Sequence, residues 1–140
     1  MYAFLYDKRP VSVNAKYTGK YQVRIRNAFS KYWPSNPILQ QELYAAVYYF
    51  HRKASQLDAD NICKPVLDAL ETLLYQDDKI VQLRRAGMFN IGQNTIDVLD
   101  LTKMPDYIVE EFFTLLDSSD HILYVEVGNL DYRMFEFSCE

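Results

Sequence analysis

The sequence has few residues of the kinds that mark several large classes of protein. Its 140 residues include two cysteines, four glycines and five prolines. Cys63 and Cys139 are far apart, so they form neither a metal knuckle nor the disulfide framework of a small secreted protein. The scarcity of glycine and proline excludes a collagen-like chain and a flexible linker. No apolar run approaches the roughly 18 residues of a membrane span, and the N-terminus does not resemble an export signal. We therefore expect a cytoplasmic protein.

Residues that can build a core are abundant. Hydrophobic residues make up 49% of the chain and charged residues 24%, and the chain contains 12 tyrosines and 8 phenylalanines. Large aromatic side chains bury enough surface to offset the entropy that the chain loses on folding. The composition therefore predicts one globular domain of ordinary size.

Charge is distributed unevenly along the chain. Residues 1–53 carry a net charge of +7, residues 54–103 carry −3 and residues 104–140 carry −8, although the whole chain has only −4. A basic first part favours a surface that faces a polyanion, while the acidic last part has to lie away from it. The alternative is that these charges are spread over an ordinary solvated surface.

Apolar periodicity and turn residues predict the order of the elements. The predicted strands cover 2–6, 42–50, 79–86 and 95–101. The predicted helices cover 20–33, 61–75 and 105–117, and a C-terminal hairpin pairs 121–127 with 132–138. This order predicts a mixed α+β, or α/β, domain.

One segment concentrates carboxylates around a lysine. Its polar residues are Asp58, Asp60, Asn61, Lys64 and Asp68, and Asp77 and Asp78 follow. Pro65 belongs in the first turn of a helix, which places the helix start near Asn61 with Asp60 or Asn61 as the cap. Because four residues advance a helix by about 400°, Asp60, Lys64 and Asp68 share one face.

Binding of a divalent cation would explain why these acids lie close together in the sequence. Neighbouring carboxylates repel one another and raise each other's pKa, and a hard cation removes that repulsion. Mg²⁺ binds through a few carboxylates and keeps water ligands that substrate phosphates can replace. The lysine and the helix N-terminus add positive potential that suits a phosphodiester. The segment therefore favours metal-assisted phosphodiester hydrolysis.

Structural explanations compete with this interpretation. Asp60 or Asn61 can be a helix cap only, Asp77 and Asp78 a turn, and Lys64 with Asp68 an exposed ion pair. A calcium loop starting at Asp58 does not fit, because it would place Cys63 where glycine is required and Ala69 where glutamate is required.

Taken together, the spacing resembles that of the RusA family of Holliday junction resolvases, over roughly residues 2–102. The matching motif is Asp-x-Asp-Asn, a lysine three residues later, an aspartate four residues after that, and then a pair of aspartates. The segment Pro10 to Asn14 is similar to the family's Pro-x-Ser-x-Asn loop. The resemblance implies a mixed α/β fold with a mixed sheet and two main helices, and a Mg²⁺-dependent homodimeric endonuclease that acts on four-way DNA junctions.

The resemblance also assigns roles to individual residues. Asp58, Asp60 and Asp78 match the catalytic carboxylates that bind the metal, and Lys64 matches the essential lysine. Asn61, Asp68 and Asp77 are candidates for supporting positions around them. We expect DNA to follow basic residues of the first part, namely Lys16, Lys20, Arg24, Arg26, Arg52 and Lys53.

These observations lead to one main hypothesis and two alternatives. The main hypothesis is a junction-resolving nuclease with a core at 1–103 and, within the same domain, an acidic extension at 104–140, whose removal we expect to tighten DNA binding. The first alternative is a non-catalytic DNA-binding or regulatory protein with the same fold. The second is an interaction protein whose acidic, aromatic C-terminal part binds a basic partner.

Overall fold

The computed structural model of the protein describes residues 1–13 and 18–138. Its strands are β1 (Tyr2–Tyr6), β2 (Leu43–His51), β3 (Val81–Asn90) and β4 (His121–Asn129). Its α-helices are α1 (Thr18–Tyr32), α2 (Ala59–Ala69) and α3 (Asp106–Ser118). Three short 3₁₀ turns complete the regular structure of the described residues, namely η1 (Asp78–Ile80), η2 (Ile96–Val98) and η3 (Tyr132–Met134). In this part of the chain, no helix is both long and apolar enough to span a bilayer.

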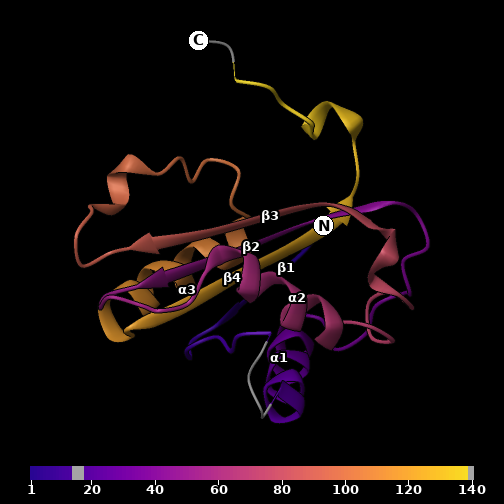
Figure 1. Cartoon of the computed structure of the whole chain (residues 1–140), viewed down its shortest axis with the longest axis horizontal. Helices are drawn as coiled ribbons and strands as arrows, with labels where there is room; N and C mark the ends of the chain where they lie inside the picture. The colour runs from indigo at the N-terminus through magenta and orange to yellow at the C-terminus, as the bar shows by residue number, and fades with distance from the viewer. Residues whose placement is uncertain (14–17, 139–140) are drawn as a thin grey trace.

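The strands form one mixed sheet in the order β1-β4-β2-β3. β2 and β3 are parallel, and α2 lies in the connection between them, whereas β4 runs antiparallel to both β1 and β2. Figure 1 shows α1 and α2 on one face of the sheet and α3 on the other. The prediction of a mixed α/β domain is confirmed.

Successive residues of the central strands point into two different cores. On β2, Leu43, Val47 and Tyr49 face α1 and α2, where Phe29 and Val66 are fully buried. Phe50 points to the opposite face, and with β1 and β4 it packs on Ile108 and Phe112 of α3. Because both faces are covered, the central strands are continuous apolar runs.

The predicted C-terminal hairpin is wrong. β4 pairs through one edge with β1 and through the other with β2, so it has no edge left for residues 132–138. These residues instead form η3 and a segment without regular structure, which extends away from the sheet (Figure 1). The acidic part 104–140 therefore contributes a central strand of the domain.

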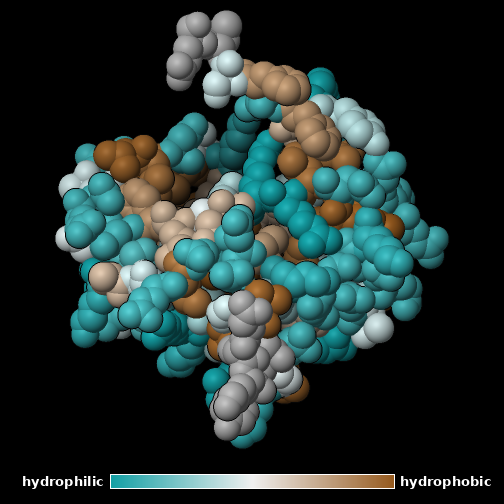
Figure 2. Space-filling model, viewed as in Figure 1, coloured by the Kyte–Doolittle hydropathy of each residue, from teal (hydrophilic) through white to brown (hydrophobic). Residues whose placement is uncertain are grey.

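The predicted strand at 95–101 is also wrong. In the structure this segment contains η2, and its apolar side chains Ile96, Leu99 and Leu101 pack as part of a loop against the core beneath α3. The alternation of apolar and acidic residues reports burial on one side, which an irregular segment lying across a sheet also satisfies. Figure 2 shows hydrophobic residues gathered over this segment, where Val98 is 68% exposed.

The helix predicted over 61–75 is shorter and begins earlier. Its N-cap is Asp58, where we predicted Asp60 or Asn61, and its last residue is Ala69. Leu70 and Leu74 beyond the helix are fully buried, but the chain turns at Thr72, whose φ of 66° is left-handed. A β-branched residue in this conformation cannot continue a helix.

Pro65 lies in the interior of α2, whereas the sequence analysis placed it in the first turn of the helix. Proline has no amide hydrogen, so the carbonyl of Asn61, four residues earlier, loses its usual helical partner. The backbone amide of Val13 donates to that carbonyl instead, at 3.2 Å. The segment that carries Pro10 is thus attached to α2 just before Lys64. Asn14, at its end, lies outside the described residues.

Candidate active site

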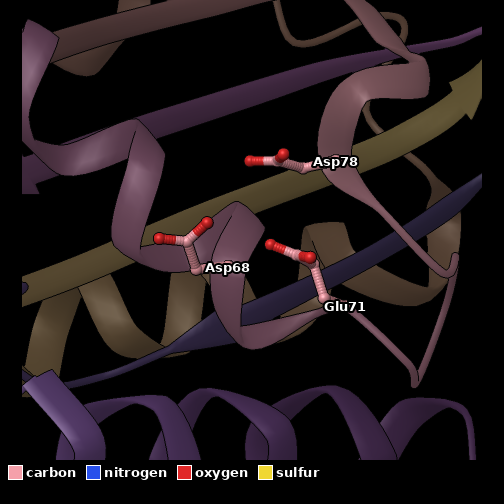
Figure 3. Close-up of side chains that lie close together, drawn as sticks. All are labelled: Asp68, Glu71 and Asp78. Carbon is pink, nitrogen blue, oxygen red and sulfur yellow. The ribbon is translucent and has the colours of Figure 1, made fainter.

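Three carboxylates face a common space between the end of α2 and η1. They belong to Asp68 on α2, Glu71 just after it and Asp78 in η1, and one oxygen of each lies within 4.8 Å of the others. Figure 3 shows the three side chains pointing toward one another. They are the only such cluster among the described residues. We call Asp68, Glu71 and Asp78 the acidic cluster.

Lys64 joins two members of the acidic cluster. Its Nζ donates to Oδ2 of Asp78 at 2.6 Å and to Oδ1 of Asp68 at 2.7 Å. The second bond is the i,i+4 contact that the sequence predicted on one helix face. The hydrogen bonds with Asp68 and Asp78 raise the pKa of Lys64, so its ammonium stays charged.

Asp78 is the buried acid of the site. The residue is 7% exposed, and Nη2 of Arg84 lies 3.5 Å from its Oδ2 and donates to its backbone carbonyl at 2.8 Å. Burial raises the pKa of Asp78, but the hydrogen bond and charge of Lys64, helped by Arg84, outweigh burial and lower it overall. The Asp78 carboxylate is therefore held ionised between two cations.

Glu71 is a member that the sequence analysis missed. The pKa of Glu71 is raised. Burial is the largest cause, and a hydrogen bond with Asp68 and the negative charges of Asp78, Asp68 and Asp77 add to it. It follows Asp68 by three residues, a spacing that places two side chains on one face of a helix. That spacing was the available signal, although the helix itself ends at Ala69.

The other predicted acids lie outside the acidic cluster. Asp58 is the exposed N-cap of α2, with Oδ2 3.5 Å from the side-chain nitrogen of Asn61, and Asp60 is exposed in the first helical turn. Because α2 rises about 1.5 Å per residue, Asp60 lies about 6 Å along the helix axis from Lys64. Asp77 caps η1 by accepting from the amide of Lys79 at 2.9 Å. Their roles in metal binding stay predictions.

The ligand chemistry of these residues fits a hard divalent cation. All the side chains offer carboxylate oxygens, which Mg²⁺ prefers, and histidine and cysteine are absent from the acidic cluster. Asp78 supplies a buried carboxylate, while Asp58 and Asp60 offer exposed ones on the same helix as Lys64. Of the described residues, only the acidic cluster brings three carboxylates within 4.8 Å of one another, and Mg²⁺ bound by a few carboxylates keeps water ligands that a phosphate can replace.

Comparison with known protein families agrees with this chemistry. Residues 7–98 match the family model described as "Endodeoxyribonuclease RusA". The chain belongs to the RusA family. The match covers the acidic cluster, Lys64 and both ends of α2, and it stops before α3 and β4. No curated protein matches the chain.

Membership in the RusA family supports an endodeoxyribonuclease. The basic residues predicted to bind DNA differ in whether they are exposed or bonded within the fold. Lys20 and Arg24 on α1 and Lys53 after β2 are exposed. Arg26 donates to the carbonyls of Ala69 and Glu71, at 3.0 and 2.8 Å, and so holds the end of α2. Arg52 donates to the Ser119 carbonyl at 3.2 Å. Lys16 lies outside the described residues.

The two arginines after the acidic pair face opposite sides of the sheet. Arg84 points toward Asp78, whereas Arg85 donates to the Met134 carbonyl at 2.6 Å on the other side. This agrees with the strand geometry of β3, in which successive side chains alternate. In this RusA-family chain, Arg84 therefore belongs to the candidate site and Arg85 does not.

Proposed function

We propose that the protein is a Mg²⁺-dependent endonuclease that resolves four-way DNA junctions during recombination and repair, as a homodimer in the cytoplasm. The observation that carries the proposal is the buried Asp78 carboxylate bonded to Lys64. The RusA-family match over residues 7–98 supports the nuclease part. Burying an acid beside two cations costs desolvation energy, and such costs are concentrated at functional sites.

Asp58, Asp60 and Asp78 are the residues that we propose to hold Mg²⁺. When bound, the metal supplies a water of lowered pKa and neutralises charge on the phosphate. Asp58 is the N-cap of α2 and Asp60 lies in its first turn, where the free amides and helix dipole attract anionic groups. The same end of the helix can therefore receive the phosphodiester.

Lys64 is the residue that we propose to act on the substrate. Its ammonium lies one turn after Asp60 and 2.6 Å from Asp78. A fixed positive charge stabilises the negative charge that develops on the phosphate oxygens in the transition state. Asn61, Asp68 and Asp77 support this arrangement from neighbouring positions.

A homodimer would explain how one complex cuts a junction. A four-way junction has two equivalent strands to cut, and a two-fold symmetric pair of subunits presents two equivalent sites. Backbone charge and junction shape supply the selectivity in this proposal, with Lys20, Arg24 and Lys53 as exposed contacts for phosphates. Sequence-specific base contacts are not required.

Cleavage of a synthetic four-way junction in Mg²⁺, Ca²⁺ and EDTA tests the proposal. We expect cutting in Mg²⁺ only. Asp78→Asn, Asp60→Asn and Asp58→Asn should each lower the cleavage rate by about 100- to 1,000-fold or more, because a group that stabilises transition-state charge is lost. Junction binding in Ca²⁺ should stay within about threefold, since backbone contacts elsewhere dominate affinity.

Asp97→Asn is the matched control, because Asp97 is an exposed acid in η2 and lies outside the acidic cluster. Its cleavage rate should equal that of the unsubstituted protein. Junction binding without cleavage in any divalent cation would favour the non-catalytic DNA-binding alternative. Full activity of Asp60→Asn would contradict the proposed metal site.

A further inference from the structure

Lys64 spans two acids that differ in burial. The side chain of Asp78 is 10% exposed, that of Asp68 is 29% exposed and that of Lys64 is 46% exposed. An ammonium has three hydrogen-bond donors, and Lys64 directs two of them to these acids at 2.6 and 2.7 Å. In this arrangement the ammonium is the positive charge nearest to the Asp78 carboxylate.

A divalent cation bound at Asp78 competes with that ammonium. Both are attracted to the same carboxylate oxygen, and the two positive charges repel each other at short range. A cation on Oδ2 of Asp78 would therefore displace Lys64 from that oxygen. A lysine released from its partner gains rotamer freedom, and this freedom would carry the ammonium into solvent.

Asp68 lies where it can keep the Lys64 ammonium from moving into solvent. It is on the same helix as Lys64, one turn later, so their bond does not depend on the position of Asp78 or η1. We propose that Asp68 is a positioning residue that keeps the Lys64 ammonium beside the site after a cation displaces it from Asp78. The ammonium is then available to the substrate phosphate. This inference rests on the proposed nuclease function and adds a role for Asp68.

Kinetics with a four-way junction test this role. At saturating Mg²⁺, Asp68→Asn should lower kcat by about 10- to 100-fold, as is usual when a supporting residue is lost, and KM should change by less than about threefold. Asp68→Glu should recover kcat to within about threefold of the unsubstituted protein, because a longer carboxylate at i+4 still reaches Lys64.

Glu71→Gln provides the matched comparison. It removes a carboxylate from the same acidic cluster, but within the described residues Lys64 has hydrogen bonds to Asp68 and Asp78 only. Loss of kcat in Glu71→Gln should be recovered by raising Mg²⁺, because only cation affinity is weakened. The loss in Asp68→Asn should persist. Recovery of both variants by Mg²⁺ would overturn the inference.

Calorimetric titration with Mn²⁺ gives a second test that requires no cleavage. Lys64→Met should bind Mn²⁺ more tightly, because the competing ammonium is gone. Asp68→Asn should weaken Mn²⁺ binding at least about threefold more when Lys64 is present than in the Lys64→Met background, since Lys64 then has only Asp78 to bind. Equal effects in both backgrounds would contradict the inference.

The two tests separate the inference from the proposed function. If the unsubstituted protein cuts no branched DNA, the proposed function fails, while the Mn²⁺ titrations still decide whether Asp68 acts through Lys64. Thermal unfolding of each variant establishes that it is folded. Asp68→Glu serves as the second variant should Asp68→Asn be unstable.

Discussion

The two parts of the chain have different roles. The first carries the candidate site, and the second completes the sheet. The segment matched by the RusA family, residues 7–98, contains Lys64 and the acidic cluster. Residues 104–138 contribute no member of that cluster, yet they provide β4, which lies between β1 and β2 in the middle of the sheet. The residues with the recognisable motif therefore depend on a later segment to complete their domain.

Truncation after residue 103 should have the largest effect, because it removes β4. The ladders of β4 with β1 and β2 are then lost, and two cores lose buried residues such as Ile122, Leu123 and Val125. Each fully buried aliphatic side chain contributes about 1.5–3 kcal/mol, so the loss of these three together with both strand ladders is comparable to the usual total stability of a domain, about 5–15 kcal/mol. We expect no cooperative thermal unfolding transition by circular dichroism.

Truncation after residue 130 is the control for this prediction. It removes η3 and the exposed side chains Tyr132, Phe135 and Phe137 but keeps the whole sheet. A cooperative transition should remain. The expectation that removing residues 104–140 tightens DNA binding stays a prediction, and charge substitutions have to test it, because that deletion removes part of the fold along with the charge. A stable, folded 1–103 fragment would show that β4 is dispensable.

Arg26→Ala should have the next largest effect, and it separates structural from DNA-facing basic residues. Arg26 satisfies the carbonyls of Ala69 and Glu71 at the end of α2, beside the left-handed Thr72. Leaving partly buried carbonyls without their donor costs about 1–3 kcal/mol. Urea unfolding should show that loss of stability.

Lys20→Ala is the matched variant for this comparison. Lys20 is an exposed cation on the same helix, so its removal should leave the free energy of unfolding within about 0.5 kcal/mol. We expect it to weaken junction binding at low salt instead. Equal stability of the two variants would show that Arg26 does not hold the end of α2.

Neutralising acids on α3 should have the smallest effect, and it tests whether the C-terminal part repels DNA. Glu110→Gln combined with Asp117→Asn removes two exposed charges on the sheet face opposite α2. Junction affinity at about 50 mM salt should rise by about two- to fivefold, and the gain should disappear at about 300 mM salt through screening. Unchanged affinity at low salt would show that these acids of the C-terminal part do not repel DNA.

The sequence predicted the helices, the central strands and part of the site for a common reason. Periodic spacing of apolar or charged residues is a local signal, and Lys64 with Asp68 on one helix face follows from it directly. The approach of Asp78 to Lys64 could only be assigned through the family motif, because it depends on how η1 packs beside α2.

The predictions that proved wrong fall where the choice of a pairing partner is not local. Residues 132–138 have the alternating pattern of a strand, but β4 already has β1 and β2 as neighbours. Glu71 was missed because it meets Asp78 only through the return of the chain beside α2, after the helix has ended at Ala69 and the backbone has turned at Thr72. Competition for the edges of a sheet and a single left-handed residue leave little trace in a hydrophobicity pattern.

The bond from the Val13 amide to the Asn61 carbonyl also has a consequence for substitutions in this protein. If Pro65 became alanine, the new amide and that of Val13 would share the Asn61 carbonyl, and the bond from Val13 would weaken. A change that looks favourable for an isolated helix would therefore loosen a connection between segments fifty residues apart in the chain, counted roughly from Val13 to Pro65. In this fold, the proline that weakens α2 by itself leaves free the carbonyl that bonds to the loop.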